Sequence, residues 1–326
     1  MSDMKRYAKI LDPDFDAILS KYDGSKFDAH VHIGNSKGTK KLLRIAEAFN
    51  IKKSLGIIWE DEKDQISEYF PDRFIFAKFF SARGLIMGKS KEVLEELDNI
   101  YARGYPVVKF WFAPGWRDYV EREFKVKINN LGLDDPLFEP LFFHMEDLGL
   151  TALIHVSDPD LWYESKYQPT SKYGTKEDHL QELENVIARH PKLKILGAHF
   201  AAQPEHLSNL GRWFDTYPNF YVDTSSARWM AREFAKQKNS VIKFFKKYAD
   251  RILFGTDTVS SRSANNLYLT SRYLTYQILW ETSEIYPLPF PDPENNNGTQ
   301  IVGLDLPLNI LKKLYWENAQ KFFSLS

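Results

Sequence analysis

The chain has 326 residues, of which 43% are hydrophobic, 15% aromatic and 27% charged, a composition that excludes an intrinsically disordered protein. The 43 basic and 44 acidic residues give a formal charge of −1, which provides no basic surface for nucleic acid. Cysteine is absent, which excludes disulfides, thiolate metal sites and cysteine nucleophiles. Any bound metal must therefore have nitrogen and oxygen ligands.

No segment of the sequence predicts export or membrane insertion. The first ten residues are too polar for the apolar core of a secretory signal, and no apolar run is long enough to span a bilayer. We therefore expect a cytoplasmic protein that acts on a small molecule and has neither a nucleic-acid nor a membrane partner. The sequence does not set the oligomeric state, and a homo-oligomer is compatible with it.

Short β-rich runs alternate with longer amphipathic stretches along the chain. The predicted strands are Phe27–His32, Ser54–Trp59, Phe74–Phe80, Pro106–Phe112, Thr151–Val156, Lys194–His199, Asn219–Thr224 and Arg251–Thr256. Several are continuous apolar runs, as expected for parallel strands that are covered on both faces. The predicted helices are Thr39–Asn50, Lys91–Arg103, Pro136–Leu148, Asp178–Arg189, Glu205–Tyr217, Arg228–Tyr248, Arg262–Trp280 and Leu308–Phe323.

Eight strands with intervening helices predict an α/β protein, a distorted (β/α)8 barrel of the TIM type, rather than an open doubly wound sheet. The segment 34–40 after the first strand matches neither glycine fingerprint of nucleotide-binding sheets. We expect one domain over residues 1–326, with an N-terminal extension at 1–26 and an extra C-terminal helix. Inserts at 157–177 and 281–307 follow strands and are expected on the C-terminal, catalytic face.

Histidines gather at the predicted ends of three strands. The first strand ends with His30 and His32, the fifth with His155 and the sixth with His199, while Asp257 lies just past the eighth. His30 and His32 share one face, because side chains alternate along a strand. Since strand ends converge on one face of a barrel, these residues predict a divalent metal site with nitrogen and oxygen ligands.

Four ordered motifs resemble the amidohydrolase superfamily. They are Phe27-Asp28-Ala29-His30-Val31-His32-Ile33-Gly34, Ile154-His155, Gly197-Ala198-His199 and Ile252-Leu253-Phe254-Gly255-Thr256-Asp257. More narrowly, they resemble the amidohydrolase-related branch that includes aminocarboxymuconate-semialdehyde decarboxylase and several lactone hydrolases. Residues 318–323 are similar to the closing helix of that branch.

The resemblance implies roles for these residues. The ligands of one divalent ion would be His30, His32, His155 and Asp257. Zinc is the ion we expect, with manganese or a metal-free site as alternatives. Asp257 would also exchange a proton with the nucleophilic water, and His199 would act as an acid or base, or as a ligand if a second ion binds. Some superfamily members carry a metal-bridging carboxylated lysine on the fourth strand, but this branch generally lacks the bridge.

The chemistry of such a site favours hydrolysis. A divalent ion lowers the pKa of its bound water towards about 7, and a carboxylate that touches this water can move its proton. We therefore expect a metal-dependent hydrolase of a small lactone, ester or amide. A metal-dependent, non-oxidative decarboxylase of a small carboxylic acid is the alternative on the same scaffold. A non-catalytic, ligand-binding barrel is a third interpretation.

Four residues at or beyond strand ends are candidates for substrate binding. They are Lys109, Trp111, Trp162 and Arg228. Lys109 is either an anion-binding or a structural group. Arg228 could hold a substrate carboxylate in bidentate geometry, or it could form a salt bridge on its helix. The two tryptophans could line the pocket or could pack as ordinary core residues.

Overall fold

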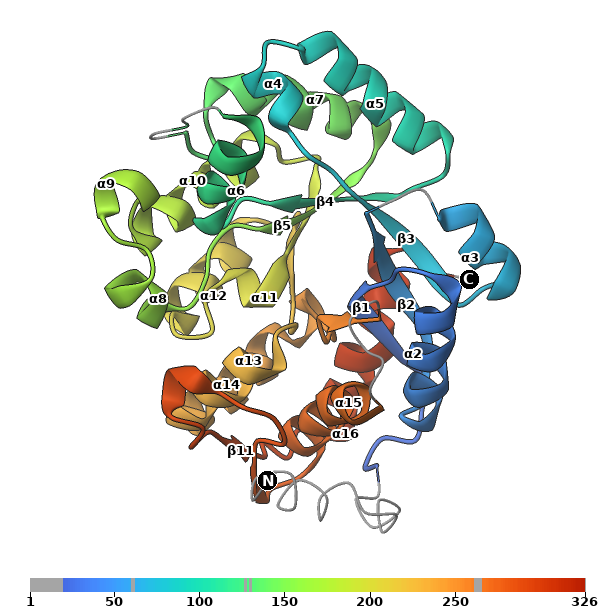
Figure 1. Cartoon of the computed structure of the whole chain (residues 1–326). Coiled ribbons are helices and arrows are strands. Elements are labelled where there is room, and N and C mark those ends of the chain that lie inside the picture. The colour runs from blue at the N-terminus through green and yellow to red at the C-terminus, as the bar shows by residue number, and fades with distance from the viewer. Residues whose placement is uncertain (1–19, 60–61, 126–127, 129–130, 261–265, 326) are drawn as a thin grey trace. The chain divides into compact units, whose positions relative to one another are not determined.

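The computed structural model describes residues 20–59, 62–125, 128, 131–260 and 266–325. The chain divides into two compact units, which are unit 1 (Met1–Ile75 and Thr224–Ser326) and unit 2 (Phe76–Asp223). Unit 1 is therefore discontinuous in sequence, and unit 2 is one continuous segment between its two parts. Both units combine mostly parallel strands with helices (Figure 1).

Unit 2 contains parallel strands that pair in the order of the sequence. The strands are β3 (Phe74–Phe79), whose residues from Phe76 onward belong to unit 2, β4 (Val107–Trp111), β5 (Thr151–His155), β6 (Lys194–Gly197) and β7 (Phe220–Asp223). The helices are α4 (Arg83–Ile86), α5 (Ser90–Ala102), α6 (Gly115–Phe124), α7 (Glu139–Leu148), α8 (Asp160–Ser165), α9 (Thr170–Tyr173), α10 (Lys176–Arg189), α11 (Ala198–Ala201) and α12 (Leu207–Thr216). The pairing register sets Trp111 opposite His155.

The core of unit 2 forms because its strands are largely apolar and its longer helices have an apolar face. Residues 152–154 of β5 are all fully buried, which is the pattern of a parallel strand covered on both sides. Helix α5 buries Val93, Leu97 and Ile100, whose spacing puts them on one helical face. It lies beside α7 (Figure 1).

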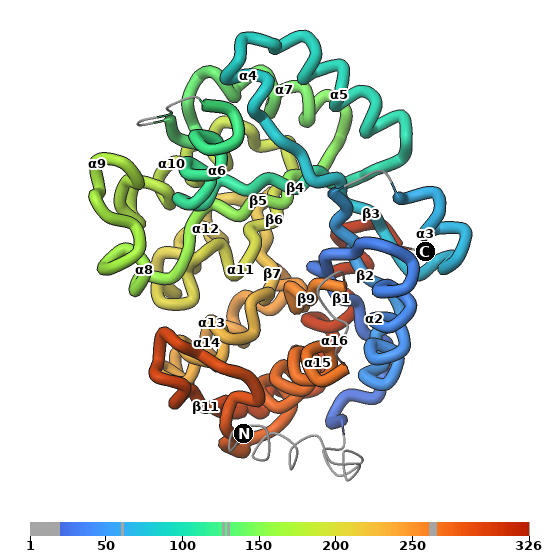
Figure 2. The backbone as a smooth tube through the Cα atoms, in the orientation of Figure 1, coloured from blue at the N-terminus to red at the C-terminus, as the bar shows by residue number. Residues whose placement is uncertain are grey.

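In unit 1 the central strand is β1 (Lys26–His32). It pairs in parallel with β2 (Ile51–Ile58) and with β9 (Thr258–Val259), which lies beside it in Figure 2. Strand β8 (Ile252–Leu253) precedes β9, and the Ala29 N–H donates to the Phe254 carbonyl at 2.7 Å. The helices are α2 (Ser36–Ala48), α3 (Lys63–Tyr69), α13 (Ala227–Lys236), α14 (Lys238–Tyr248), α15 (Asn266–Glu281), α16 (Leu308–Lys312) and α17 (Asn318–Phe322), with a π-helical turn at Lys313–Glu317.

Each predicted strand overlaps a strand of the described structure, but β2 begins at Ile51 rather than Ser54, and two predicted strands extend at least two residues too far at their C-terminal ends. The strand expected at Arg251–Thr256 is only β8, and β9 follows after Asp257, whose φ of +57° interrupts the extended backbone. The strand expected at Lys194–His199 ends at Gly197, because His199 also has a positive φ. Extended pairing cannot continue through a left-handed residue.

The helix predictions also need corrections. The stretch expected as one helix from Arg228 to Tyr248 is two helices, α13 and α14, separated at Gln237, whose φ is −141°. The first residues of the helix expected at Arg262–Trp280 lie outside the described residues, and α15 begins at Asn266. The expected insert 281–307 contains an antiparallel hairpin of β10 (Ile285–Pro287) and β11 (Gln300–Val302).

The described residues confirm an α/β fold of mostly parallel strands, whereas the closed barrel and the single domain stay predictions. Most of the expected N-terminal extension, residues 1–19, lies outside the described residues.

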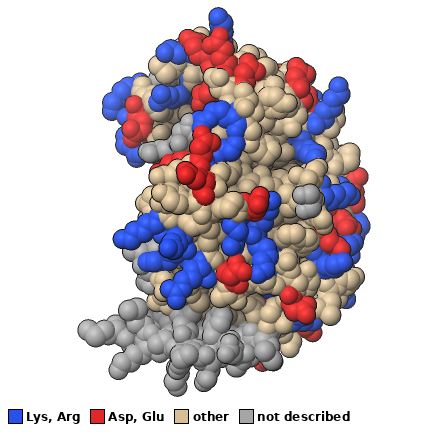
Figure 3. Space-filling model, turned by 90° about the vertical axis from the view of Figure 1, so that its right-hand side faces the viewer, with Lys and Arg blue, Asp and Glu red and all other residues tan. Residues whose placement is uncertain are grey.

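Among the helices that are described, none has the length and apolarity needed to cross a membrane. On the face in Figure 3, basic and acidic side chains are interspersed.

Candidate functional site

Three potential metal ligands of unit 1 lie together. His30 and His32 project from the end of β1, and Asp257 lies between β8 and β9. The Asp257 Oδ1 is 3.2 Å from His32 Nε2 and 3.7 Å from His30 Nε2. One ligand atom from each of the three residues lies within 4.8 Å of the others. The ligands predicted at the ends of the first and eighth strands therefore lie together within unit 1, and their binding of a metal stays a prediction.

Backbone hydrogen bonds hold Asp257 beside the two histidines. The Asp257 N–H donates to the His30 carbonyl at 2.8 Å, and the Ser260 N–H donates to the His32 carbonyl at 2.8 Å. The β1–β9 register sets Val31 opposite Thr258. Because main-chain bonds from β1 fix both sides of Asp257, its left-handed conformation is a built feature of the site.

Asp28 is a buried carboxyl group that organises the same strand ends and that the sequence analysis did not single out. It accepts hydrogen bonds from the His30 N–H at 3.1 Å, the Thr256 N–H at 3.0 Å and the Thr256 hydroxyl at 2.6 Å. Burial raises the pKa of Asp28 to about 7, although these hydrogen bonds favour the carboxylate. The sequence did contain a signal for Asp28. It lies two residues before His30, so the two side chains are on the same face of β1.

The donor set fits a divalent ion. Two imidazole nitrogens and a carboxylate oxygen suit zinc and, through the carboxylate, manganese. Ser225 Oγ lies 3.2 Å from His30 Nδ1, so Nε2 is the ring nitrogen on the Asp257 side. A hydrogen bond on the other ring nitrogen is the usual way in which proteins orient a metal-binding histidine.

Two further predicted histidines lie together in unit 2. His155 ends β5 and its ring is 4.4 Å from that of His199, centroid to centroid, at an interplanar angle of 80°. His155 Nε2 is 3.2 Å from Asp158 Oδ1, and the Tyr167 hydroxyl donates to Asp158 Oδ2 at 2.6 Å. Burial opposes ionisation of Asp158, but His155 and Tyr167 together hold its pKa below the usual value. Asp158 is a second site residue that the sequence analysis missed.

His199 begins a run of four left-handed residues. The φ values of residues 199–202 are +56°, +59°, +51° and +58°, and none of the four is glycine. Each such residue costs about 1–2 kcal/mol relative to a right-handed conformation. The His199 N–H donates to Asp223 Oδ1 at 3.0 Å, and the Ala202 N–H donates to the His199 carbonyl at 2.9 Å. Backbone strain of this kind is concentrated at functional sites, where surrounding contacts maintain it.

Comparisons with known proteins establish the family. A model of the amidohydrolase family matches residues 95–325. The chain belongs to this amidohydrolase family. The matched region includes His155, His199 and Asp257, while β1 with His30 and His32 precedes it. No curated protein matches significantly in sequence.

Two solved structures share the amidohydrolase fold of this chain. The 5-carboxyvanillate decarboxylase of Sphingomonas paucimobilis has a TM-score of 0.55 and 12% sequence identity, over 93% of this chain and 99% of that one. The 5-carboxyvanillate decarboxylase of Novosphingobium aromaticivorans has a TM-score of 0.53 and 14% identity, over 94% and 97%. The latter was solved with manganese and 4-hydroxy-3-methoxy-5-nitrobenzoic acid.

The predicted substrate-binding residues of unit 2 have structural neighbours of their own. Lys109 is buried within β4, and Trp111 at the end of that strand packs against Tyr119 with ring centroids 6.1 Å apart. The Lys166 ammonium lies 3.2 Å from the centroid of the Trp162 ring, in cation–π geometry. Substrate binding by Lys109, Trp111 and Trp162 stays a prediction.

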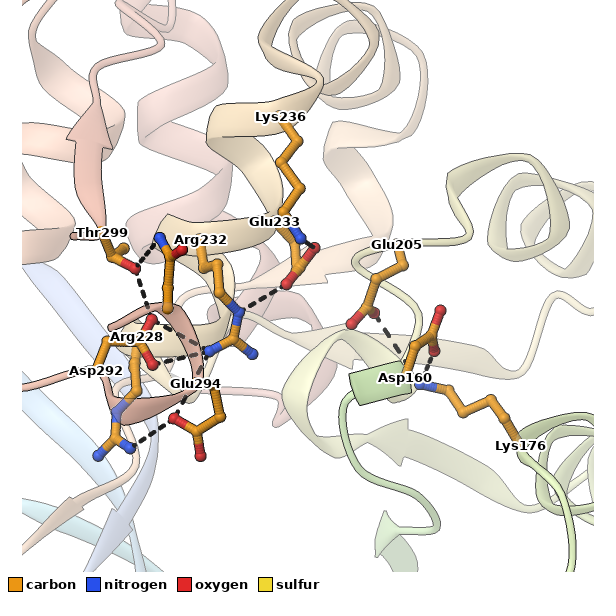
Figure 4. Close-up of polar contacts among 11 residues, drawn as sticks. Asp160, Lys176, Glu205, Arg228, Arg232, Glu233, Lys236, Asp292, Glu294 and Thr299 are labelled. Carbon is orange, nitrogen blue, oxygen red and sulfur yellow. Dashed lines mark hydrogen bonds and ion pairs between the residues drawn. The ribbon is translucent and has the colours of Figure 1, made fainter. Parts of the chain in front are cut away.

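Arg228 forms a salt bridge with a residue outside its own helix, and its binding of substrate stays a prediction. It lies in the first turn of α13, and its Nη1 is 3.3 Å from Glu294 Oε2 (Figure 4). Arg232, one turn later, binds Asp292 Oδ1 at 2.9 Å and Glu233 Oε1 at 2.8 Å (Figure 4). The segment between β10 and β11 thus neutralises both arginines of α13.

Proposed function

We propose that this amidohydrolase is a metal-dependent, non-oxidative decarboxylase of a small carboxylic acid. The observation that carries the proposal is the His30, His32 and Asp257 donor group in unit 1. The reaction class is supported by the two solved structures of the same fold, both of which are decarboxylases. This support favours decarboxylation over the hydrolysis that the sequence alone led us to expect.

The roles proposed for the site residues are those that the family resemblance implies. His30, His32, His155 and Asp257 would be metal ligands, and His199 would be the acid. A bound divalent ion would supply positive charge that orients the substrate and stabilises negative charge developing on it. Manganese and zinc both fit the donor set, and the manganese in one similar structure makes manganese as good a candidate as zinc.

Decarboxylation needs a proton at the carbon that loses the carboxylate. The bond between that carbon and the carboxylate carbon breaks, its electron pair stays on the substrate, and carbon dioxide leaves. The substrate carbon then takes one proton, so charge and atoms balance. We assign this proton to His199, because its backbone is fixed by Asp223 and its ring is packed against His155.

Hydrolysis of a lactone, ester or amide is the second candidate. It is favoured by the match to the amidohydrolase family and by Asp257, a carboxylate beside two imidazoles that could take a proton from a nucleophilic water. The two reactions use the same groups. In decarboxylation, the carbon that loses the carboxylate receives a proton, whereas in hydrolysis the carbonyl carbon is attacked by water.

The test compares the two chemistries on one preparation. The purified protein is analysed for metal, loaded with manganese or zinc, and supplied with a panel of arenecarboxylic acids and a panel of lactones. We expect release of carbon dioxide from an acid, with metal at one ion per chain, and no release after chelation. Ring opening of lactones without release of carbon dioxide would show that the protein is a hydrolase instead.

A further inference from the structure

Arg272 is a cation of unit 1 that stacks on aromatic rings. It lies on α15, and its guanidinium carbon is 3.5 Å from the centroid of the Phe290 ring and 4.8 Å from that of Tyr268. Phe290 belongs to the segment between β10 and β11. Stacking of this kind holds the planar guanidinium in one orientation while leaving the N–H groups at its edge available for an acceptor.

Arg272 has no carboxylate partner among the described residues. Its Nη1 is buried without a hydrogen-bond partner, and no salt bridge joins its guanidinium to a described carboxylate. Burial lowers the pKa of Arg272 from its usual value, and the charge of Arg228 lowers it further. Buried polar atoms are normally satisfied, so this donor points to an acceptor that is not part of the described chain.

The two neighbouring arginines of α13 differ from Arg272 in this respect. Arg228 is paired with Glu294, and Arg232 is paired with Asp292 and Glu233 (Figure 4). The same β10–β11 segment supplies carboxylates to Arg228 and Arg232 but an aromatic ring to Arg272. Among the described residues, Arg272 is therefore the arginine of these three that has no salt bridge.

The helix of Arg272 is linked through Tyr268 to the strand that follows Asp257. Tyr268, one turn earlier on α15, accepts a hydrogen bond at its hydroxyl from the Val259 N–H at 3.3 Å. Val259 pairs with His32 in the β1–β9 register and follows Asp257 by two residues. The negative charge of Asp257 acts on Arg272 and raises its pKa, opposing the effect of burial. An anion held by Arg272 would thus lie on the side of unit 1 that carries His32 and Asp257.

We infer that Arg272 binds an anionic group of the substrate other than the carboxylate that leaves. This inference rests on the proposed decarboxylation and adds a substrate class, which is a small acid with two anionic groups. A cation bound to the departing carboxylate would stabilise the substrate more than the transition state, because that carboxylate loses its charge as it becomes carbon dioxide. A second anionic group keeps its charge throughout, so Arg272 can hold it without raising the barrier.

The test uses benzoate and isophthalate, which differ by one carboxylate. Their binding to the metal-loaded protein is measured by titration calorimetry. We expect wild type to bind isophthalate more tightly, and Arg272→Met to weaken isophthalate by about 10- to 100-fold, the range for a lost charged hydrogen bond. Methionine keeps an unbranched apolar stem over Phe290, and benzoate binding should change by less than about threefold.

Two further variants provide controls. Arg272→Lys keeps the charge but loses the planar fork, so we expect it to recover part of the isophthalate affinity. If Arg272→Met does not fold, the comparison of Arg272→Lys with wild type still tests the inference. Arg122→Gln removes an exposed arginine of α6 that is paired with Glu123, and it should leave both affinities unchanged. A wild type with no preference for isophthalate, or equal losses of both ligands in Arg272→Met, would overturn the inference.

The same variants separate this inference from the proposed function. Selective loss of isophthalate binding with no carbon dioxide from any acid would retain the anion site and reject the decarboxylase. Release of carbon dioxide from a diacid with an unchanged KM in Arg272→Met would retain the decarboxylase and reject the anion site.

Discussion

The two units hold their predicted site residues in different ways. In unit 1, His30, His32 and Asp257 are joined by parallel strand pairing, and their ligand atoms face one another. In unit 2, the His155 side chain lies beside the Asp158 carboxylate, and the His199 backbone N–H donates to the Asp223 carboxylate. Unit 1 offers a ligand group, whereas unit 2 offers histidines in prearranged hydrogen-bonding environments.

This difference suggests a division of labour. A metal needs several donors that converge on a point, which the pairing of β1 with β9 supplies together with the left-handed backbone of Asp257. A proton-transferring histidine needs a fixed orientation, which unit 2 provides with buried hydrogen bonds and a strained backbone. We therefore expect substitutions in unit 1 to remove metal and substitutions around His199 to affect turnover.

A large effect on turnover is expected in His199→Asn. The change removes the proton-transferring group, so kcat of the metal-loaded enzyme should fall by about 10²- to 10⁴-fold. Metal content, measured by elemental analysis, should stay near that of wild type, because three histidines and an aspartate remain in the proposed ligand set. Loss of the metal, or two ions per chain in wild type, would make His199 a ligand.

Substitution of the unit 1 histidines should have the opposite signature. His30→Ala and His32→Ala each remove a proposed ligand. Loss of a residue that only hydrogen-bonds to a ligand typically lowers metal affinity by about 10- to 100-fold, so these variants should lose at least that much affinity. Competition with a fluorescent chelator measures the affinity. Asp257→Asn should abolish turnover yet keep part of the metal, because an amide oxygen still coordinates weakly. Wild-type affinity in both histidine variants would contradict the ligand assignment.

The strained run in unit 2 predicts a stability effect at Gly197. A Cβ at this position would lie 2.7 Å from Ala201 Cβ and 3.1 Å from Phe220 Cζ, and Ala201 is fixed within the left-handed run. Gly197→Ala should therefore lower the free energy of unfolding by about 1–3 kcal/mol, the cost of overpacking a core. Urea denaturation measures the change.

Gly115→Ala is the matched control for this change. A Cβ at Gly115 has its nearest contact at 3.6 Å, and alanine is the better helix former at the start of α6. It should leave stability unchanged or raise it slightly. Equal destabilisation by both substitutions would show that tight packing against residues 199–202 is not the cause.

The smallest expected effect is the pH dependence of one ion pair of unit 2. His206 Nε2 is 2.8 Å from Asp160 Oδ2, and this hydrogen bond raises the pKa of His206. Burial opposes ionisation of Asp160, but His206 and Lys176 lower its pKa to about 2. The histidine contribution is present below about pH 6.5 and is lost as pH rises through its raised pKa, while the aspartate contribution is lost as pH falls from about 4 towards 2.

Both side chains of this pair are more than one third exposed, so the effect is screened and should be well under 1 kcal/mol. Urea denaturation of wild type and His206→Gln should show the larger difference in stability at pH 5.5 and the smaller at pH 8.5. A difference that grows between these two values would contradict the assignment.

The sequence predicted the parts of the molecule that periodicity controls. Continuous apolar runs located the strands, and the alternation of side chains placed His30 and His32 on one face. Asp28, Asp158 and Arg272 were missed for a different reason. Their roles depend on which residues surround them after folding, and no local pattern distinguishes them from ordinary charged residues.

The left-handed conformations were also beyond the reach of sequence patterns. Glycine and asparagine are the usual signals of a positive φ, and the run His199-Phe200-Ala201-Ala202 contains neither. Its conformation is imposed by tertiary contacts such as the bond from the His199 N–H to Asp223. For the same reason, the sequence could not show that β6 ends before His199 or that Asp257 separates β8 from β9.

The discontinuity of unit 1 has a consequence for how the protein is made. His30 and His32 leave the ribosome early, but Asp257 is synthesised only after the whole of unit 2. Unit 2 is one continuous segment and could begin to fold during translation, whereas unit 1 must wait for its second part. The candidate metal-binding group of three can therefore be completed only near the end of synthesis, after the strands of unit 2 have left the ribosome.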